Sequence, residues 1–569
     1  MNFPPKQKAV SQSGVAVSSA FAFKAKLAFA IIPAILYAVF QATVIFAGNL
    51  AEDAFILFEY VNHFVQGFGI SYNIDGMHVE GATDFLWMFM LSCLGWIGIS
   101  PPIAAALLNA FGFGLFSWVI VSILLQHQSK TPESDTHKAD LLWLQYAAWL
   151  LIIVCLLFSH FVFAAYVGFS TALYAGLIAL GLKRVQDESA TSYRDVPLLA
   201  LVLGLFRPDG VVLGGIMVLI KLYFAFTNRQ MKPLVIWSFV SLIGGIVYFI
   251  WRMQYFGELL PLPLYVKSDS THAFVGYYVN MSWFYENIHW FLITGFLVAL
   301  CQGWSRLYIL APGFFWFLML MTSTQTQNIG DRYQMPLFIS FIVYMSVVWH
   351  KVSWRFSQPA LILMVIAGVH LITCYDDLPQ RMNQRIWGHH YVVPFAKLID
   401  PYVDDNTKVA VTEAGRIAYF NDAHIIDLVG LNTPELSKNR VDYDYLVELN
   451  PDMLFFYHDM LIRHVDGQEG DLIRLNPMAF KQLVDKSRLY KYPDARRERE
   501  SHAASVAVDY LFQNYEEYEF FLMYMPEFKD HRHVFAIKKD FQYKSEIIDA
   551  LDRSQRLPSN YYSVMSLSK

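Results

Sequence analysis

Long apolar runs separated by short polar segments fill the first two-thirds of the chain. A helix needs about 20 mostly apolar residues to cross the hydrocarbon core of a bilayer. The pattern therefore predicts a polytopic α-helical membrane protein with about eleven spans. We place these spans at residues 27–47, 102–126, 142–160, 162–182, 196–206, 210–226, 234–252, 284–301, 307–322, 335–350 and 359–375.

One apolar run is too short to be counted as a span. Residues 85–99 (FLWMFMLSCLGWIGI) are interrupted by Gly95, and a run of this length suits an interfacial or half-inserted helix. With this run at the interface, Lys and Arg gather in the loops on one side, which the positive-inside rule assigns to the cytoplasm. The N-terminus is then cytoplasmic, and the segment after the first span lies outside.

The character of the sequence changes at Asp376. Charged residues become frequent, and the apolar runs shorten to strand length at 408–412, 424–431, 452–457 and 533–538. Glycines and helical stretches separate these runs, which is typical of an α/β domain. We therefore predict a transmembrane module over 1–375, with an outer loop and interfacial helices at 48–101, and an extracytoplasmic soluble α/β domain over 376–569.

Composition narrows the class of protein further. The chain has 569 residues, of which 55% are hydrophobic, and its net charge of −5 does not suggest a nucleic-acid partner. Its four cysteines lie apart in apolar segments, so neither a disulfide framework nor a zinc site is indicated. The chain has no Walker-type phosphate loop and no GxGxxG after a strand, which argues against a nucleotide-sugar donor used from the cytosol. The tail has no GxSxG elbow either.

The outer loop over 48–84 carries the candidate chemistry. It contains six carboxylates and no Lys or Arg, and Glu52 and Asp53 stand where the chain leaves the lipid. A carboxylate pair at a membrane surface suits acid–base catalysis. The alternative is helix capping, because acidic residues in a first turn stabilise its exposed amides by on the order of 1 kcal/mol.

Other side chains of this loop favour a built site. Tyr60 and Tyr72 offer flat surfaces of the kind on which sugars stack, and several glycines bend the segment back on itself. His63 and His78 match no metal-ligand spacing, so a hydrogen-bonding role is favoured for them. A divalent metal is left open, and no cofactor is indicated with certainty.

Three basic residues lie on the side that the positive-inside rule disfavours: Arg207, Lys267 and Arg332. Each has an ordinary explanation as an ion pair, for example Arg207 with Asp209 or Arg332 with Asp331. Three such cations facing an acidic loop instead indicate an anion site, most naturally for a phosphate at the membrane surface.

Several motifs along the chain resemble those of a known family. They are ED-AFI-x-F-x-Y (52–60), GFGISYN (67–73), VEGATDFLW (79–87), GFSTALY (168–174), FRPDG (206–210), PLPLYVKS (261–268), DRYQMP (331–336) and EAGRIAYF with IIDLVGL (413–431). In this order they resemble the GT-C glycosyltransferases that use lipid-linked sugars. They are most similar to the terminal β-1,2 arabinofuranosyltransferases of mycobacteria and to pilin arabinosyltransferases. The chain departs from that family at Glu52, Ser170 and Asp209, where the family usually has Asp, Glu and Glu.

The resemblance implies an enzyme of the bacterial inner membrane. It would transfer a sugar, D-arabinofuranose in the nearest relatives, from a polyprenyl phosphate to an extracytoplasmic glycan or pilin-like protein. We expect Asp53 as the catalytic base, with Glu52 orienting the acceptor or sharing that role. Arg332, then Arg207 and Lys267, would bind the donor phosphate, and the remaining substrate contacts would come from Tyr60, Tyr72, Glu80, Asp84 and Tyr333.

Two other functions stay open. One is a GT-C transferase of another sugar acting on lipopolysaccharide. The other is a transporter of lipid-linked sugars, which would need charged residues deep within its spans, where the sequence has few.

Overall fold

The structure is a computed structural model. It describes residues 13–46, 50–74, 77–128, 149–153, 156, 160–268, 273–287, 304–322, 328–348, 392–457, 472–476, 480, 498–524 and 532–555. The predicted helix at 359–375, most of each of those at 142–160 and 284–301, and the predicted domain boundary at residue 376 lie outside these residues.

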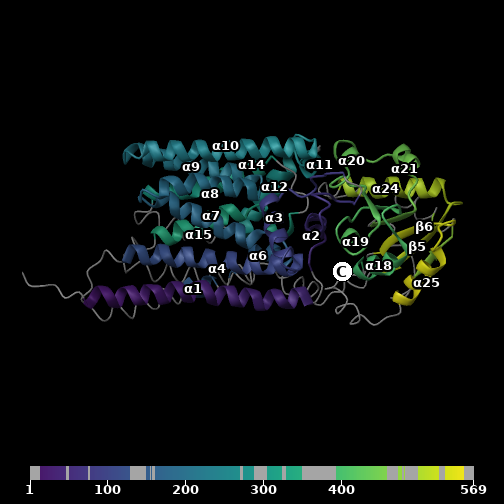
Figure 1. Cartoon of the computed structure of the whole chain (residues 1–569), viewed down its shortest axis with the longest axis horizontal. Coiled ribbons are helices and arrows are strands. Elements are labelled where there is room, and N and C mark those ends of the chain that lie inside the picture. Colours follow the sequence, from purple (N-terminus) through teal and green to yellow (C-terminus); the bar gives the residue numbers. More distant parts are fainter. Residues whose placement is uncertain are drawn as a thin grey trace, which may run out of the picture.

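Helices account for the N-terminal part. They are α1 (Ser13–Phe46), α2 (Glu52–Gln66), α3 (Phe85–Gly95), α4 (Pro101–Gln128), α6 (His160–Tyr166), α7 (Thr171–Gln186), α8 (Ser192–Phe206), α9 (Asp209–Thr227), α10 (Met231–Phe256), α11 (Leu262–Ser268), α12 (Ala273–Asn287), α14 (Ala311–Leu320) and α15 (Met335–Val348), with 3-10 turns η2 (Trp304–Leu310) and η3 (Ile329–Asp331). The long helices run along the long axis of the molecule, and α2 lies between them and the C-terminal sheet (Figure 1).

Among the described residues, four helices are long and apolar enough to cross a membrane. They are Phe23–Ala42, Pro101–Gln126, Asp209–Thr227 and Met231–Phe256. Only 6% of the most apolar stretch of α10 is buried within the protein. Most of this helix therefore presents side chains such as Val247 to its surroundings. An apolar surface of this kind is stable against lipid and not against water. The chain is therefore a membrane protein, with helices long enough to span a bilayer where residues 27–47, 102–126, 210–226 and 234–252 predicted them.

The short run after the acidic loop forms a short helix. Helix α3 has 11 residues and is thus about 16 Å long, roughly half the thickness of the hydrocarbon core. The predicted break at FRPDG is also present, because α8 ends at Phe206 and α9 begins at Asp209. The remaining predicted spans within the described residues form shorter helices, so the full count of eleven stays a prediction.

The C-terminal part contains a six-stranded mixed sheet with strand order β2-β1-β3-β6-β5-β4. Strand β1 pairs in parallel with β2 and β3, whereas β3–β6, β6–β5 and β5–β4 are antiparallel. The strands are β1 (Lys408–Val411), β2 (His424–Asp427), β3 (Met453–Tyr457), β4 (Ile473–Leu475), β5 (Tyr518–Tyr524) and β6 (Arg532–Lys538). The sequence predicted four of these and missed β4 and β5. Strand β2 is shorter than the predicted run 424–431, because the chain turns after Asp427 through Gly430, whose φ is 89°.

Helices cover both faces of this sheet. They are α18 (Val392–Ile399), α19 (Arg416–Tyr419), α20 (Pro434–Lys438), α21 (Tyr443–Leu449), α24 (Glu498–Gln513) and α25 (Lys544–Gln555), with the 3-10 turn η5 (Asp400–Tyr402). Alternate residues along a strand point to opposite faces. Ala410 and Leu454 accordingly belong to a core that includes α24, whereas Val409 and Phe455 belong to a second core.

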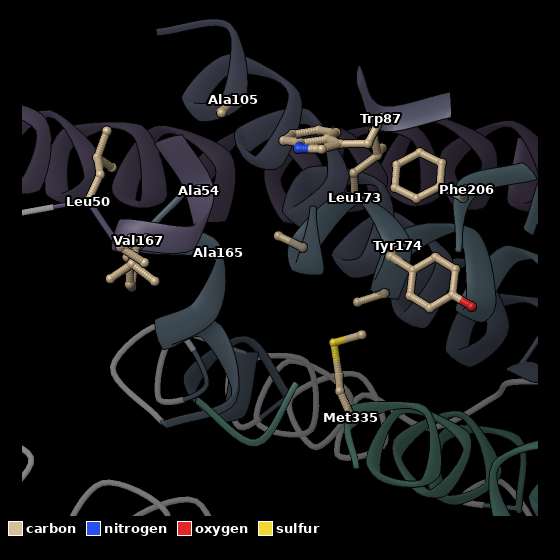
Figure 2. Close-up of a cluster of buried hydrophobic side chains, with 14 of the residues drawn as sticks. Leu50, Ala54, Trp87, Ala105, Ala165, Val167, Leu173, Tyr174, Phe206 and Met335 are labelled. Carbon is tan, nitrogen blue, oxygen red and sulfur yellow. The ribbon is translucent and has the colours of Figure 1, made fainter. Parts of the chain in front are cut away.

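The second core continues into the helical part without interruption. The ring of Phe55 in α2 lies 5.2 Å from that of Tyr419 and 5.4 Å from that of Phe420, measured between centroids. Figure 2 shows the part of this core within the membrane module, where Trp87, Tyr174 and Phe206 pack together. The two parts of the chain are thus joined by buried apolar contacts directly beside α2.

Candidate functional site

A cavity of about 80 Å³, within about 580 Å³ of space that is partly open to solvent, lies at the start of α2, where the helical part meets the C-terminal part. It is lined by side chains from segments far apart in the sequence, among them Asp53, Thr83, Asp84, Trp87, Phe169 and Arg332. Three of the residues predicted for the site, Asp53, Asp84 and Arg332, therefore face one common space. This cavity is our candidate active site.

Asp53 occupies the first turn of α2 and is half-buried. The amides of a helix N-terminus carry partial positive charge, which stabilises a carboxylate there in its ionised form. The N-cap residue is Ala51, which makes no side-chain cap, so Asp53 contributes a favourable charge to the first turn while lining the cavity. An ionised carboxylate facing a cavity is able to accept a proton from a hydroxyl group bound there.

Glu52 turns the other way, toward the C-terminal part. Its Oε1 accepts hydrogen bonds from the backbone amides of Gly415 and Arg416, each at 2.8 Å, and its Oε2 is 2.7 Å from Nη1 of Arg416. Arg416 also donates through Nη2 to the carbonyl oxygen of Leu50. The Arg416 side chain is 4% exposed, so this is a largely buried link between the two parts.

Arg332 is presented by an unusual stretch of backbone. Gly330 and Asp331 both have left-handed φ values, 64° and 49°, and the second is uncommon for a residue other than glycine. The guanidinium carbon lies 3.7 Å from the ring centroid of Phe169, and Nη2 lies 3.4 Å from the hydroxyl of Tyr333. In the part of the chain that the structure describes, its buried Nε has no hydrogen-bond partner. Arg332 thus has one buried donor that no protein group among the described residues uses.

Arg207 lies deeper and is paired. Its Nε is 3.0 Å from Oδ1 of Asp209, and both side chains are buried. The guanidinium carbon also stands 5.1 Å from the ring centroid of Tyr174 and 5.6 Å from that of Tyr333. Burial lowers the pKa of Arg207, but the carboxylates of Asp209 and Asp84 outweigh this effect, and the pKa lies above its ordinary value. The ion pair that the sequence offered as an alternative is therefore present.

Asp84 links the cavity to these neighbours. Its Oδ2 accepts a hydrogen bond from Ser170 Oγ at 3.0 Å, and its Oδ1 accepts one from Thr83 Oγ1 at 3.1 Å. Ser170 stands where the resembling family usually carries a Glu. Two carboxylates side by side would repel each other, whereas a serine hydroxyl donates to Asp84.

Tyr60, Tyr72 and Glu80 are fully or nearly fully buried and are bound to protein groups. Tyr60 donates to Asn432 Oδ1 at 3.1 Å and accepts from the amide of Gly81 at 3.0 Å. Tyr72 donates to the carbonyl oxygen of Ala414, and Glu80 Oε2 lies 2.5 Å from Arg252 Nη2. None of the three is among the side chains that line the cavity.

The two other expected binding residues are placed differently. Tyr333 contacts both arginines, as described above. Lys267 lies in α11, but its side chain is outside what the structure describes.

A loop of the C-terminal part contributes residues that the sequence did not single out. Asp427 is buried and accepts hydrogen bonds from the amides of Val429 and Asn432 at 2.9 and 3.0 Å, and from Asn432 Nδ2 at 3.0 Å. Burial, only partly offset by these bonds, raises its pKa to about 6. The side-chain oxygen of Asn432 accepts a hydrogen bond from the Tyr60 hydroxyl, which in turn accepts one from the backbone amide of Gly81 beside the cavity. Asp427 and Arg416 lie inside the motifs at 413–431, but nothing in those motifs indicates that Asp427 binds Asn432 or that Arg416 binds Glu52.

In the described ranges, no group of three or more His, Cys, Asp or Glu side chains is arranged to hold a metal ion. His63 has its Nε2 3.0 Å from Oε1 of Glu59, and its Nδ1 donates to the carbonyl oxygen of Ser71 at 3.0 Å. The ring of His78 stacks on that of Tyr255 with centroids 4.0 Å apart.

Comparison with known proteins adds one finding. Residues 384–544 match the model of a domain of unknown function, DUF8728. The match falls within the C-terminal part and leaves the helical part unassigned. No curated protein matches the chain.

Proposed function

We propose that this chain is a GT-C glycosyltransferase with about eleven spans. It takes a sugar, D-arabinofuranose in our proposal, from a polyprenyl phosphate and transfers it to an acceptor outside the bacterial inner membrane. The N-terminus is cytoplasmic, and the C-terminal part is periplasmic. The observation that carries this proposal is the cavity in which Asp53, Asp84 and Arg332 meet.

The proposed reaction requires a base and an anion site within one small space. The acceptor hydroxyl oxygen bonds to the anomeric carbon, and the bond from that carbon to the phosphate oxygen breaks. Asp53 accepts the hydroxyl proton, and the lipid phosphate leaves with the electron pair. Arg332 stabilises the negative charge that develops on the leaving phosphate.

The surroundings of Arg332 support this role. Its guanidinium rests against Phe169, and its Nε is buried without a hydrogen-bond partner among the described residues. A phosphate oxygen would satisfy that donor, and guanidinium–phosphate contacts are among the strong hydrogen bonds in proteins. Arg207 is neutralised by Asp209, so we assign it a supporting role in the field of the cavity.

Donor turnover by the purified full-length protein tests the proposal. Synthetic polyprenyl phosphates carrying labelled arabinofuranose, mannose, galactose or aminoarabinose are each incubated in detergent micelles with an envelope glycan extract. We expect lipid phosphate to be released and label to enter the glycan with the arabinofuranose donor. Transfer from another donor alone would overturn the choice of sugar. Absence of transfer from all four would overturn the proposed enzyme. Observed transfer would favour the enzyme over a transporter, because transport has no meaning in micelles.

A further inference from the structure

A second and larger hollow lies on the other side of the segment that borders the cavity. This groove holds about 1140 Å³ of open space between the outer loop and the C-terminal part. Met77 and Val79 line it from the loop, and Tyr445, Glu435 and Glu448 line it from the C-terminal part. About 490 Å³ of this space is accessible to water, which is within the range of about 300–1,000 Å³ found for ligand pockets.

The side chains that line the groove indicate which class of ligand it can bind. Tyr445 is half-buried, and its pKa is raised to about 12, mainly by burial and further by the negative charges of Glu435 and Glu448. Both carboxylates are therefore near the Tyr445 side chain. Glu435 and Glu448 are themselves exposed and able to accept hydrogen bonds from hydroxyl groups. An aromatic face between carboxylate acceptors fits a sugar, which has hydroxyl groups at its edge and C–H groups on its faces.

The charge of the groove argues against an anionic ligand. Lys408 also lines it, with its Nζ donating to the carbonyl oxygen of Leu449 at 3.2 Å, so the two glutamates outnumber the one lysine. Glu435 and Glu448 would repel a phosphate or a lipid headgroup. A neutral ligand rich in hydroxyl groups is the class that these walls accept.

The groove and the cavity are neighbours along two stretches of chain. Val79 lines the groove and Gly81 lines the cavity, while Asn432 lines the groove and Leu431 lines the cavity. The hydrogen bonds from Tyr60 to Asn432 and from Gly81 to Tyr60 form the shared wall. This wall closes the direct path, so a chain lying in the groove would bring its end beside the cavity and reach it around the wall.

The rim of the groove is fixed before any ligand binds. The side-chain amide of Asn73 donates to the carbonyl oxygen of Ile425 at 3.0 Å and accepts from its amide at 2.9 Å. Ile425 belongs to β2, an edge strand of the sheet, so Asn73 pairs with the edge much as a neighbouring strand would. Fixed walls reduce the entropic cost of binding a flexible chain.

We propose that this groove binds the non-reacting sugars of a neutral glycan acceptor and directs its terminal hydroxyl toward Asp53. The orientation of the terminal hydroxyl toward Asp53 rests on the proposed function. Glycan binding in the groove does not, and it is measurable without any transfer.

Binding is measured on the detergent-solubilised full-length chain in the absence of donor. The probes are a linear arabinofuranose hexasaccharide and a linear mannose hexasaccharide, followed by saturation-transfer NMR. Tyr445→Ala should weaken binding about fivefold, the factor that corresponds to an aromatic stacking contact of about 1 kcal/mol. Glu448→Gln should weaken it as well, whereas Tyr445→Phe keeps the ring and should bind nearly as well as wild type.

Matched controls lie outside the groove at Tyr515 and Glu516, both exposed on the turn before β5. Tyr515→Ala and Glu516→Gln should leave binding unchanged. Equal binding by wild type and Tyr445→Ala, or no binding of either hexasaccharide, would overturn the inference. Binding of an extended peptide in place of the glycans would overturn it too.

The transfer assay separates this inference from the proposed function. If transfer occurs but Tyr445→Ala leaves the KM for the acceptor unchanged, the groove assignment fails and the enzyme stands. If no donor is turned over but hexasaccharide binding depends on Tyr445, the proposed enzyme fails and the groove stands as a glycan-binding site.

Discussion

The carboxylate of Glu52 in the membrane module is bound by Arg416 of the C-terminal part, with Nη1 and Oε2 2.7 Å apart. Two backbone amides at the start of α19 complete the contact. Because Glu52 adjoins Asp53, this link fixes the first turn of α2 and with it the carboxylate that faces the cavity. The two carboxylate oxygens of Glu52 are thus occupied by protein donors, and we propose that Glu52 positions Asp53.

Loss of Arg416 should destabilise the protein and slow transfer together. Arg416→Ala leaves a largely buried carboxylate without its cation, which costs about 3 kcal/mol in comparable buried pairs. We expect a lower Tm and a reduced kcat with little change in the KM for the donor. Arg474→Ala is the control, because Arg474 pairs with Glu519 but is 68% exposed, and its loss should cost less than about 1 kcal/mol. Equal effects of the two substitutions would contradict the positioning role.

Asp53→Asn should abolish transfer while the protein still binds the donor. The amide retains the shape of the side chain but is unable to accept the proton of the acceptor, and loss of a general base costs typically about 10²–10⁴ in rate. The kcat of transfer and the Kd of a donor analogue are measured in parallel. Asp540→Asn, at an exposed aspartate of the C-terminal part, provides the matched control. Wild-type turnover by Asp53→Asn would refute the assignment of the base.

Arg332→Ala should weaken binding of the lipid phosphate. Hydrogen bonds to charged groups contribute about 1.5–3 kcal/mol, which corresponds to roughly a 10- to 100-fold increase in the Kd of the donor. Arg332→Lys should recover only part of this, since an ammonium lacks the planar set of donors. Arg194→Ala, at an exposed surface pair, should leave the Kd unchanged. Donor affinity that is independent of Arg332 would argue against the phosphate contact.

Gly81 should tolerate no side chain. A Cβ there would stand 1.9 Å from Asn432 Oδ1 and 2.5 Å from the Tyr60 hydroxyl, so Gly81→Ala must break the hydrogen bonds between the loop and the C-terminal part. We expect a lower Tm and reduced transfer. At Gly215, within α9, a Cβ meets no atom within 4 Å, and Gly215→Ala should be neutral or stabilising by up to about 1 kcal/mol. A thermal-shift assay compares the two variants. Similar Tm values would contradict the close packing of Gly81 against Asn432 and Tyr60.

Asp427 should make stability fall as the pH rises. Its pKa is about 6 in the folded protein, above the ordinary value of 3.8, so the native state binds more protons than the unfolded state between these values. The sign is the reverse of that for a salt-bridged carboxylate. This contribution is fully present below pH 4 and is lost as the pH passes 6. Subtracting the Tm profile of Asp427→Asn from that of wild type between pH 4.5 and 7.5 isolates it, and a flat difference would contradict the assignment.

The amino-acid sequence was enough to place the chain among membrane proteins and to name candidate site residues. Apolar runs of span length specify membrane helices because backbone amides in lipid must be satisfied within the helix. Residues 27–47, 102–126, 210–226 and 234–252 accordingly gave the four long helices. The acidic segment after the first span also pointed to Asp53 and Asp84, and the basic residues on the disfavoured side pointed to Arg332.

Which of these residues lie together depends on the folded chain. Glu52 and Asp53 are neighbours in sequence, yet a helix turns successive side chains by about 100° and sends one to Arg416 and the other to the cavity. Arg416 and Asn432 are more than 350 residues from their partners Glu52 and Tyr60, as recorded by the separations of 364 and 372. Such pairs depend on how whole elements pack, a property that no local pattern of residues encodes.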